Sequence, residues 1–145
     1  MKIHLTRRYS FAASHRLHTT RLDEEENQRI YGKCSNPYGH GHNYAVEVTV
    51  SGPVDPATGM VAHLESLDSF VSREVLEPFD HTYLNEEVAE FRERVPTTEN
   101  LCIEIYRRLA VFPGVHLERV RIEETGLNSF EYSGEPHGDS LRSNA

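Results

Sequence analysis

Residue types that do chemistry gather in the stretch GKCSNPYGHGHNY, which spans residues 32–44. His40 and His42 are separated by one residue, so on a strand their side chains project from the same face and can hold one ion. His15 is the best candidate for a third nitrogen, because it follows a predicted strand and a neighbouring strand can bring it beside the pair. Three neutral imidazoles with one open position are typical of a catalytic zinc site.

A structural explanation of the same histidines stays open at this point. The chain holds nine histidines, so an H-x-H pair can also arise by chance or for packing. Five histidines have no comparable spacing and are interpreted as surface or core residues: His4, His18, His63, His116 and His137.

Cys34 lies six residues before His40 and has two possible roles. It could be a fourth zinc ligand that closes a structural site, or a nearby base or nucleophile, which needs its thiolate. A cysteine base needs a neighbour that takes up its proton, and FDHTYL offers Asp80 beside His81. An Asp-His pair is also common in surface turns, so the spacing alone does not decide between these alternatives.

Two glutamates are further candidates for a site. Glu124 shares one face of a predicted strand with Val120 and Ile122, so a carboxylate ends an apolar stripe. A buried carboxylate needs a partner, which predicts either a site residue or a satisfied polar group of the core. Glu99 suits the first turn of a predicted helix, and it could also point at a ligand rich in N–H groups.

The elements that must position these residues follow from hydrophobic periodicity. Alternation predicts strands over residues 3–11 and 42–50, and it returns in residues 116–125 and 129–134 around a glycine, as in a hairpin. Helical spacing predicts a helix over residues 63–76, which Pro78 helps to end. A second helix begins at Thr97 or Thr98, either of which can cap it, and ends before Pro113. Residues 18–30 show no apolar period and are expected to form a solvated, mobile connection.

This order of elements predicts an α+β fold, a mainly antiparallel sheet covered on one face by two helices. The 145 residues fit one domain, expected over 1–135, with a disordered tail over 136–145. Two cysteines do not form a disulfide framework, and Cys102 lies in an apolar helical pattern typical of the core.

Charge and hydropathy exclude several classes of partner. A formal net charge of -8 argues against general binding of nucleic acid or anionic membranes. Local basic residues such as Arg7, Arg8, Arg16 and Lys33 could still meet a small anionic substrate. No apolar run reaches membrane-spanning length and the first residues alternate, so we expect a soluble cytoplasmic protein.

Six motifs, in this order, resemble the 6-pyruvoyl-tetrahydropterin synthase family: SFAASHRL, YGKCSNPYGHGHNY, DPATGMV, FDHTYLN, PTTENL and IEET. The resemblance runs from about Arg8 to Glu135. It implies the tunnelling fold, in which each subunit contributes a four-stranded antiparallel sheet with two helices on one face. Three subunits then close a β-barrel, and two barrels stack into a homohexamer with active sites at the subunit interfaces.

The resemblance also implies roles for residues. Zinc would be held by His15, His40 and His42, and Cys34 would be a catalytic base. Asp80 and His81 match family residues that reach the cysteine from a neighbouring subunit, and Glu124 matches a further charge-relay glutamate. The pterin-anchoring region of the family is matched by Thr97, Thr98 and Glu99.

The reaction implied is the conversion of 7,8-dihydroneopterin triphosphate to 6-pyruvoyl-tetrahydropterin, by a carbon–oxygen lyase that eliminates triphosphate without a redox cofactor. A related branch, 6-carboxy-tetrahydropterin synthase of the queuosine pathway, resembles Cys-x3-His-x-His, whereas five residues separate Cys34 from His40 here. The longer loop favours the pyruvoyl branch. A non-catalytic zinc- or pterin-binding module is the third reading, although Cys34, Asp80, His81 and Glu124 are all present.

Overall fold

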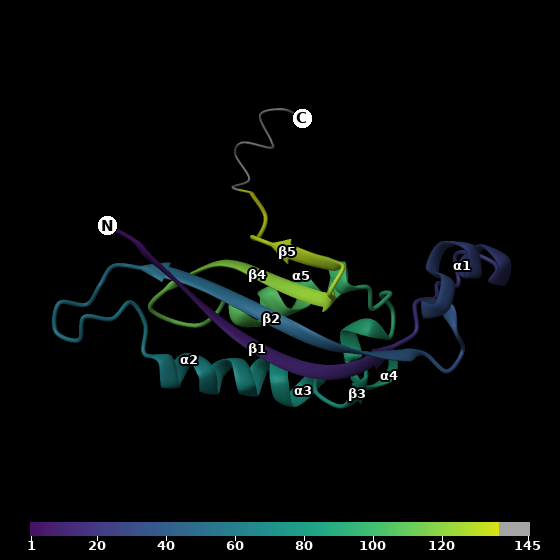
Figure 1. The fold of residues 1–145 in the computed structure, drawn as a ribbon, viewed down its shortest axis with the longest axis horizontal. Helices are drawn as coiled ribbons and strands as arrows, with labels where there is room; N and C mark the ends of the chain where they lie inside the picture. Colours follow the sequence, from purple (N-terminus) through teal and green to yellow (C-terminus); the bar gives the residue numbers. More distant parts are fainter. Residues whose placement is uncertain (137–145) are drawn as a thin grey trace.

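A computed structural model describes residues 1–136 (Figure 1). Of the tail expected over 136–145, residues 137–145 lie outside the described residues. The elements are β1 (Ile3–His15), α1 (Glu24–Tyr31), β2 (His40–Gly52), α2 (Leu64–Val71), α3 (Glu77–Phe79), β3 (Thr82–Tyr83), α4 (Leu84–Glu87), α5 (Thr98–Leu109), β4 (His116–Thr125) and β5 (Asn128–Tyr132). Three short turns add to these: 3-10 turns at Gly32–Ser35 and Ala89–Phe91, and a π-helical turn at Ser72–Leu76.

The sheet has five strands in the order β3-β1-β2-β4-β5. The expectation of four antiparallel strands is therefore corrected: β1, β2, β4 and β5 do pair antiparallel, but the two-residue β3 adds a parallel edge beside β1. Strands β1 and β2 pair without a break from Ile3 opposite Gly52 to His15 opposite His40. Strand β1 therefore runs past its predicted end at Phe11, because the end of β2 supplies backbone partners.

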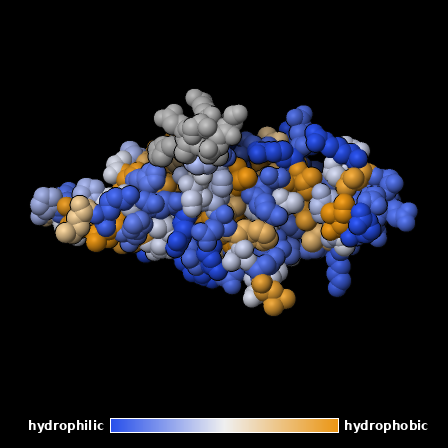
Figure 2. All heavy atoms as spheres, turned by 90° about the horizontal axis from the view of Figure 1, so that it is seen from above, coloured by the Kyte–Doolittle hydropathy of each residue, from blue (hydrophilic) through white to orange (hydrophobic). Residues whose placement is uncertain are grey.

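The core lies between one face of the sheet and the helices α2, α3 and α5 (Figure 1). Alternate residues of the strands supply it, as a sheet with one covered face requires. Its largest buried side chains include Tyr44, Phe79, Leu67, Leu84, Leu101, Ile105 and Ile122. The prediction that Cys102 belongs to the core is confirmed, since 2% of this residue is exposed. Figure 2 shows a surface that is mainly hydrophilic, with hydrophobic residues in separate patches. Within residues 1–136, no helix is long and apolar enough to cross a bilayer.

The first predicted helix continues three residues beyond its expected end, to Phe79. Proline has no N–H, so Pro78 leaves a carbonyl of the preceding turn without a helical partner. The helix accommodates this with a π-helical turn, in which the Glu77 N–H donates to the Ser72 carbonyl. The Glu74 carbonyl instead accepts a hydrogen bond from Arg108 Nη1 at 3.2 Å, which joins this helix to α5.

The segment expected to be a mobile connection contains α1, so that prediction is wrong. Asp23 caps the helix by accepting from the Glu26 N–H at 2.8 Å, and three glutamates occupy the first turn. Asn27 is 1% exposed; its amide group donates to the carbonyls of Thr19, Leu22 and Asp23 and accepts from the Thr19 N–H. Polar bonds to the backbone fix this segment, which explains why it lacks an apolar period.

Candidate metal and catalytic site

The register of β1 and β2 brings three histidines to one point. His15 lies directly opposite His40, and His42 lies opposite Ala13. His15 and His40 are directly paired, so their side chains project from the same face of the sheet. His42 shares this face because it is two residues from His40 on one strand. The His42 Nε2 atom lies 3.2 Å from His15 Nε2 and 2.9 Å from His40 Nε2. The end of the β1–β2 ladder therefore collects three ring nitrogens.

Cys34 joins the histidines from the 3-10 turn that precedes β2. Its Sγ atom lies 3.4 Å from His40 Nε2, and one ligand atom from each of the four residues lies within 4.8 Å of all the others. Two bonds hold this turn against the end of β1. The Leu17 N–H donates to the Cys34 carbonyl at 2.6 Å, and Arg16 Nε donates to the Ser35 carbonyl at 3.0 Å.

Gly39 lets the loop between Cys34 and His40 pass close to β1. Its φ is +69°, a left-handed conformation that side chains disfavour. A Cβ atom at this position would lie 2.8 Å from the His15 carbonyl oxygen. The loop therefore requires glycine for both its conformation and its closeness to the strand.

His15 is fully buried and its ring is oriented by two groups. Its Nδ1 atom lies 2.9 Å from the Pro96 carbonyl oxygen and 3.3 Å from the Tyr44 hydroxyl, which leaves Nε2 facing the other histidines. Burial lowers the pKa of His15 to about 4, so the imidazole is neutral at pH 7. Burial also lowers the pKa of His42. Neither orienting group has a signal in the sequence, because Pro96 acts through its backbone and Tyr44 is part of an apolar strand face.

This donor set fits a divalent metal ion. Two nitrogens bound to one zinc ion at about 2.0–2.1 Å lie about 3.3 Å apart in a tetrahedral site. The two Nε2 separations of 2.9 and 3.2 Å approach that value. Neutral imidazoles and a cysteine thiolate are also ligand types that suit zinc among the divalent metals. His15, His40, His42 and Cys34 could therefore hold a metal ion.

Glu124 lies beside this cluster at the end of β4. One of its carboxylate oxygens accepts a hydrogen bond from the hydroxyl of Thr98, which is 2% exposed. The thiol of Cys34 has a raised pKa, chiefly through burial and also through the negative charge of Glu124. Thr97 caps α5 by accepting from the Asn100 N–H at 3.2 Å, one of the two capping alternatives predicted.

Glu99 belongs to the first turn of α5 and is not among the residues that could hold a metal ion. It is exposed in the first turn of α5, as its structural explanation predicted. Within residues 1–136, no hydrogen bond or ion pair involves its side chain. The structure therefore brings Glu124 and Thr98 to the site but not the carboxylate of Glu99.

Asp80 and His81 form a pair at the other edge of β1. Asp80 Oδ1 accepts from the Ala12 N–H at 2.9 Å, and Oδ2 lies 3.0 Å from His81 Nδ1. The hydrogen bond from Ala12 is the largest cause of the lowered pKa of Asp80. His81 has a φ of +60°, a strained value for a residue with a side chain, and the bond from its N–H to the Ala12 carbonyl (2.6 Å) helps to hold it.

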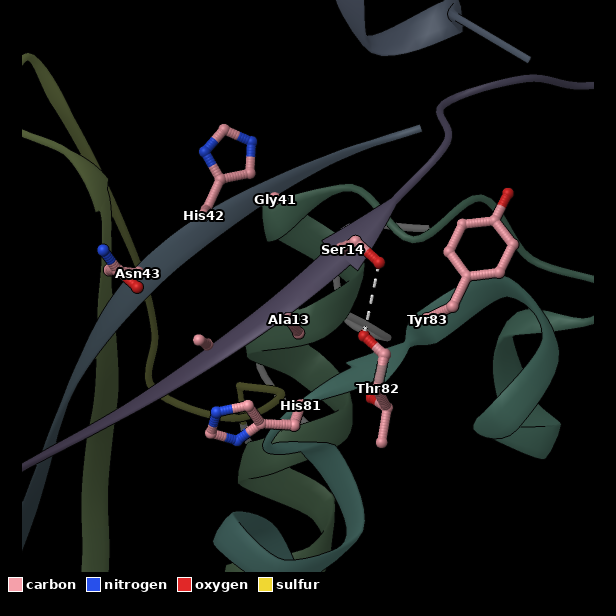
Figure 3. Close-up of a pocket in the computed structure, with 9 residues that line it drawn as sticks. Ala13, Ser14, Gly41, His42, Asn43, His81, Thr82 and Tyr83 are labelled. Carbon is pink, nitrogen blue, oxygen red and sulfur yellow. Dashed lines mark hydrogen bonds between the residues drawn. The ribbon is translucent and has the colours of Figure 1, made fainter. Parts of the chain in front are cut away.

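His81 borders a pocket that also reaches the histidine cluster. Its side chain is 82% exposed, and it lies across β1 from His42, with which it lines a pocket of about 390 Å³ (Figure 3). His81 and His42 thus line one pocket, while neither Asp80 nor His81 is hydrogen-bonded to the Cys34 thiol within residues 1–136.

Comparisons with known proteins bear on this arrangement. The family model described as 6-pyruvoyl tetrahydropterin synthase matches residues 4–135. The chain is 48% identical over 133 residues to 6-pyruvoyl tetrahydrobiopterin synthase of Poecilia reticulata, covering 91% of this chain and 90% of that protein. It is 46% identical over 132 residues to the Homo sapiens protein of the same name, covering 90% and 91% respectively.

A solved structure gives the same result. The structure of Caenorhabditis elegans 6-pyruvoyl tetrahydropterin synthase superposes with a TM-score of 0.88 at 40% identity, covering 93% of this chain and 97% of that one. The matches extend over nearly the whole chain, including the strands that carry the histidine cluster. The chain therefore belongs to the 6-pyruvoyl tetrahydropterin synthase family.

Proposed function

We propose that the chain converts 7,8-dihydroneopterin triphosphate to 6-pyruvoyl-tetrahydropterin with elimination of triphosphate, as a carbon–oxygen lyase. The observation that carries this proposal is the convergence of His15, His40, His42 and Cys34 within 4.8 Å, in a member of this family. Relatives that match about nine-tenths of the chain are named for this activity.

The proposed cofactor is zinc, held by Nε2 of His15, His40 and His42. Support comes from the neutral, oriented ring of His15, because a ligating imidazole must be deprotonated and is usually fixed by a bond to its other nitrogen. When bound, zinc would supply Lewis acidity toward an oxygen of the substrate's side chain.

Cys34 is the proposed base that moves protons on the pterin side chain. Only the thiolate can accept a proton, and both burial and the charge of Glu124 disfavour the thiolate. The base therefore needs a cationic or proton-accepting partner when substrate is present. The role of partner is proposed for an Asp80–His81 pair, in which Asp80 orients the imidazole.

That pair would come from a neighbouring subunit. Within one chain the pair is not bonded to Cys34, and the His81 side chain is mostly exposed, so it is available to a second molecule. The proposed assembly is a homohexamer of two stacked trimers, each closed into a β-barrel, with active sites between subunits and no nucleic acid or membrane partner.

The proposed pterin anchor joins Glu124 to Thr98. The Thr98 hydroxyl donates a hydrogen bond to the Glu124 carboxylate. The family resemblance implies charge relay for Glu124 and pterin binding for Thr98, so this bond joins the two regions. A pterin ring presents N–H and amino donors along one edge, and the second oxygen of the Glu124 carboxylate is an acceptor suited to them. Glu99 and Thr97 would support this anchor from the start of α5, where Thr97 fixes the first turn.

The test gives purified, zinc-loaded protein 7,8-dihydroneopterin triphosphate and identifies the pterin product by mass. A product that has lost triphosphate and kept its three-carbon side chain supports the proposal. A shortened side chain with released acetaldehyde would identify the 6-carboxy branch. No turnover would indicate a binding module.

Two variants separate the metal ligands from the base. Cys34→Ala is expected to keep one zinc ion per chain and to lose turnover, whereas His42→Ala is expected to lose both, because it removes one of three ligands. Zinc content by atomic spectroscopy and product formation are the two measurements. Loss of zinc from Cys34→Ala would return the thiol to the ligand set.

Mixing two inactive variants tests whether sites are shared. Cys34→Ala and His81→Ala chains, unfolded together and refolded as mixed oligomers, would restore both groups in about a quarter of sites if the pair acts on a neighbour's thiol. Activity that stays at zero after mixing, with mixed oligomers present, would show that each site uses groups of one chain.

A further inference from the structure

Most cations of this acidic chain are paired with carboxylates. Within residues 1–136, nine lysine and arginine side chains lie within 4.0 Å of a carboxylate oxygen. The remaining five form no such ion pair in that part of the chain: Arg16, Arg21, Lys33, Arg92 and Arg119.

Two of these five cationic residues, both arginines, line one pocket. Arg16 and Arg92 line a pocket of about 270 Å³ together with Arg94 and His18. Among residues 1–136, each of the two donates only through its Nε atom: Arg16 to the Ser35 carbonyl at 3.0 Å and Arg92 to the Glu86 carbonyl at 3.2 Å. The two terminal nitrogens of both guanidinium groups therefore remain for a ligand.

The other charges of the pocket leave it positive. Arg94 Nη2 lies 3.3 Å from Glu104 Oε1, so part of its charge is already compensated. Glu93 contributes one carboxylate to the lining. Three guanidinium groups face one lining carboxylate, in a chain whose formal net charge is -8.

This pocket shares one residue with the surroundings of the histidine cluster. Pro96 lines the pocket, and its carbonyl oxygen is the group that lies 2.9 Å from His15 Nδ1. Arg16 directly follows His15, the last residue of β1, and it donates to the carbonyl of Ser35, the residue after Cys34. Pro96 and Arg16 therefore connect the pocket to His15.

We propose that this pocket, the arginine pocket, binds the triphosphate group of the substrate; the inference rests on the proposed function. A triphosphate carries several negative charges, which the field of an acidic chain repels unless cations gather locally. Planar guanidinium groups with free terminal nitrogens bind phosphate oxygens in pairs of charge-assisted hydrogen bonds. The arginine pocket offers two such groups.

A second pocket, of about 760 Å³, competes for this role. It lies beside His40 and is lined by Lys33, the only cation among its residues. An ammonium group offers a point charge and no paired donors. The arginine pocket is therefore favoured, and Lys33→Gln becomes the competing variant in the test.

The first measurement titrates the metal-free full chain with inorganic tripolyphosphate in a calorimeter, so that chelation of zinc does not contribute. Arg92→Gln is expected to weaken binding at least about tenfold, because it removes a charged donor pair. Arg119→Gln is the matched control, since it makes the same charge change at an exposed residue of β4 that does not line the arginine pocket, and it is expected to stay within about twofold. No binding to the wild type, an equal loss in Arg119→Gln, or a loss only in Lys33→Gln would each overturn the proposal.

The second measurement uses turnover. Arg92→Gln is expected to raise KM for 7,8-dihydroneopterin triphosphate at least about tenfold and to leave kcat nearly unchanged. Arg92→Gln should be inhibited by 7,8-dihydroneopterin, which lacks the triphosphate, as strongly as the wild type is. If inhibition weakened as much as KM rose, the assignment of the arginine pocket to the triphosphate would be overturned. A chain without turnover would refute the proposed function, whereas the calorimetric result reports on the pocket independently. Arg16→Lys, which retains a positive charge beside Ser35, is the second variant for the calorimetric titration. It is expected to lose less affinity for tripolyphosphate than Arg92→Gln does.

Discussion

Gly39 tests how the loop before β2 and the end of β1 position the histidine cluster. In Gly39→Ala the new Cβ would lie 2.8 Å from the carbonyl oxygen and 3.2 Å from the carbonyl carbon of His15. These are backbone atoms of a paired strand, so they cannot turn aside as a flexible side chain does. The φ of +69° adds the strain of a left-handed conformation.

The magnitude follows from these two costs. A left-handed conformation costs an alanine about 1–2 kcal/mol, and an overlap with fixed atoms costs about 1–3 kcal/mol more. Gly59→Ala is the matched control, because Gly59 has a φ of +73° and no atom within 4 Å of an added Cβ. We therefore expect Gly39→Ala to be less stable than Gly59→Ala by about 1–3 kcal/mol.

The assay is urea unfolding of the metal-free protein at one fixed protein concentration, since association also contributes to stability. A zinc titration of both variants accompanies it. Gly39→Ala is expected to bind zinc more weakly, because the adjacent His40 must move with the loop, whereas Gly59→Ala should bind like the wild type. Equal stability and equal zinc affinity of the two variants would refute the argument from close approach.

Three further predictions concern groups outside the loop. Glu104 is 1% exposed and bonded to three arginines, so Glu104→Gln should lower the free energy of unfolding by about 3 kcal/mol, measured by urea denaturation; a loss below about 1 kcal/mol would contradict this. The hydrogen bond from Arg7 lowers the pKa of Asp68 in the folded protein. The ionised carboxylate therefore stabilises the fold above its unfolded pKa of about 3.9, and this stabilisation is lost as the pH falls through the lower pKa of the folded state. Stability measured from pH 5 downward should therefore fall less steeply in Asp68→Asn than in the wild type, and parallel curves would contradict the assignment. Burial raises the pKa of Cys102 to about 12, so a thiol reagent at pH 8 should modify only Cys34 in the native chain and both cysteines in urea; two fast thiols in the native chain would contradict this.

The sequence predicted the parts of the site that follow from strand alternation. The spacing of His40 and His42 places both on one face, and the strand pattern near His15 indicated which element could approach them. The structure brings these three rings together because β1 and β2 pair over their full length. The same pattern predicted too short a first strand, since small residues such as Ala12 and Ser14 give no apolar signal while their backbone still pairs.

Other parts of the fold depend on contacts that periodicity does not encode. Helix α1 is fixed by Asn27 and by the Asp23 cap, and only the cap followed by three acidic residues was a signal in the sequence. Strand β3 has two residues, and its place beside β1 depends on the bond between Asp80 and the Ala12 N–H. The carbonyl of Pro96, which orients His15, has no side-chain signature at all.

The proposed metal ligands and the proposed base belong to parts of the chain with different freedom to change. The three histidines are fixed by the β1–β2 ladder, whereas Cys34 sits on the connection between those strands. Residues can be inserted into or removed from the connection between Cys34 and Gly39 without altering the register of the β1–β2 pair, so the thiol can be moved relative to three fixed histidine rings. Loop grafting on this scaffold would then change which proton is removed while metal binding is retained, and this offers a route to redirecting the product by design.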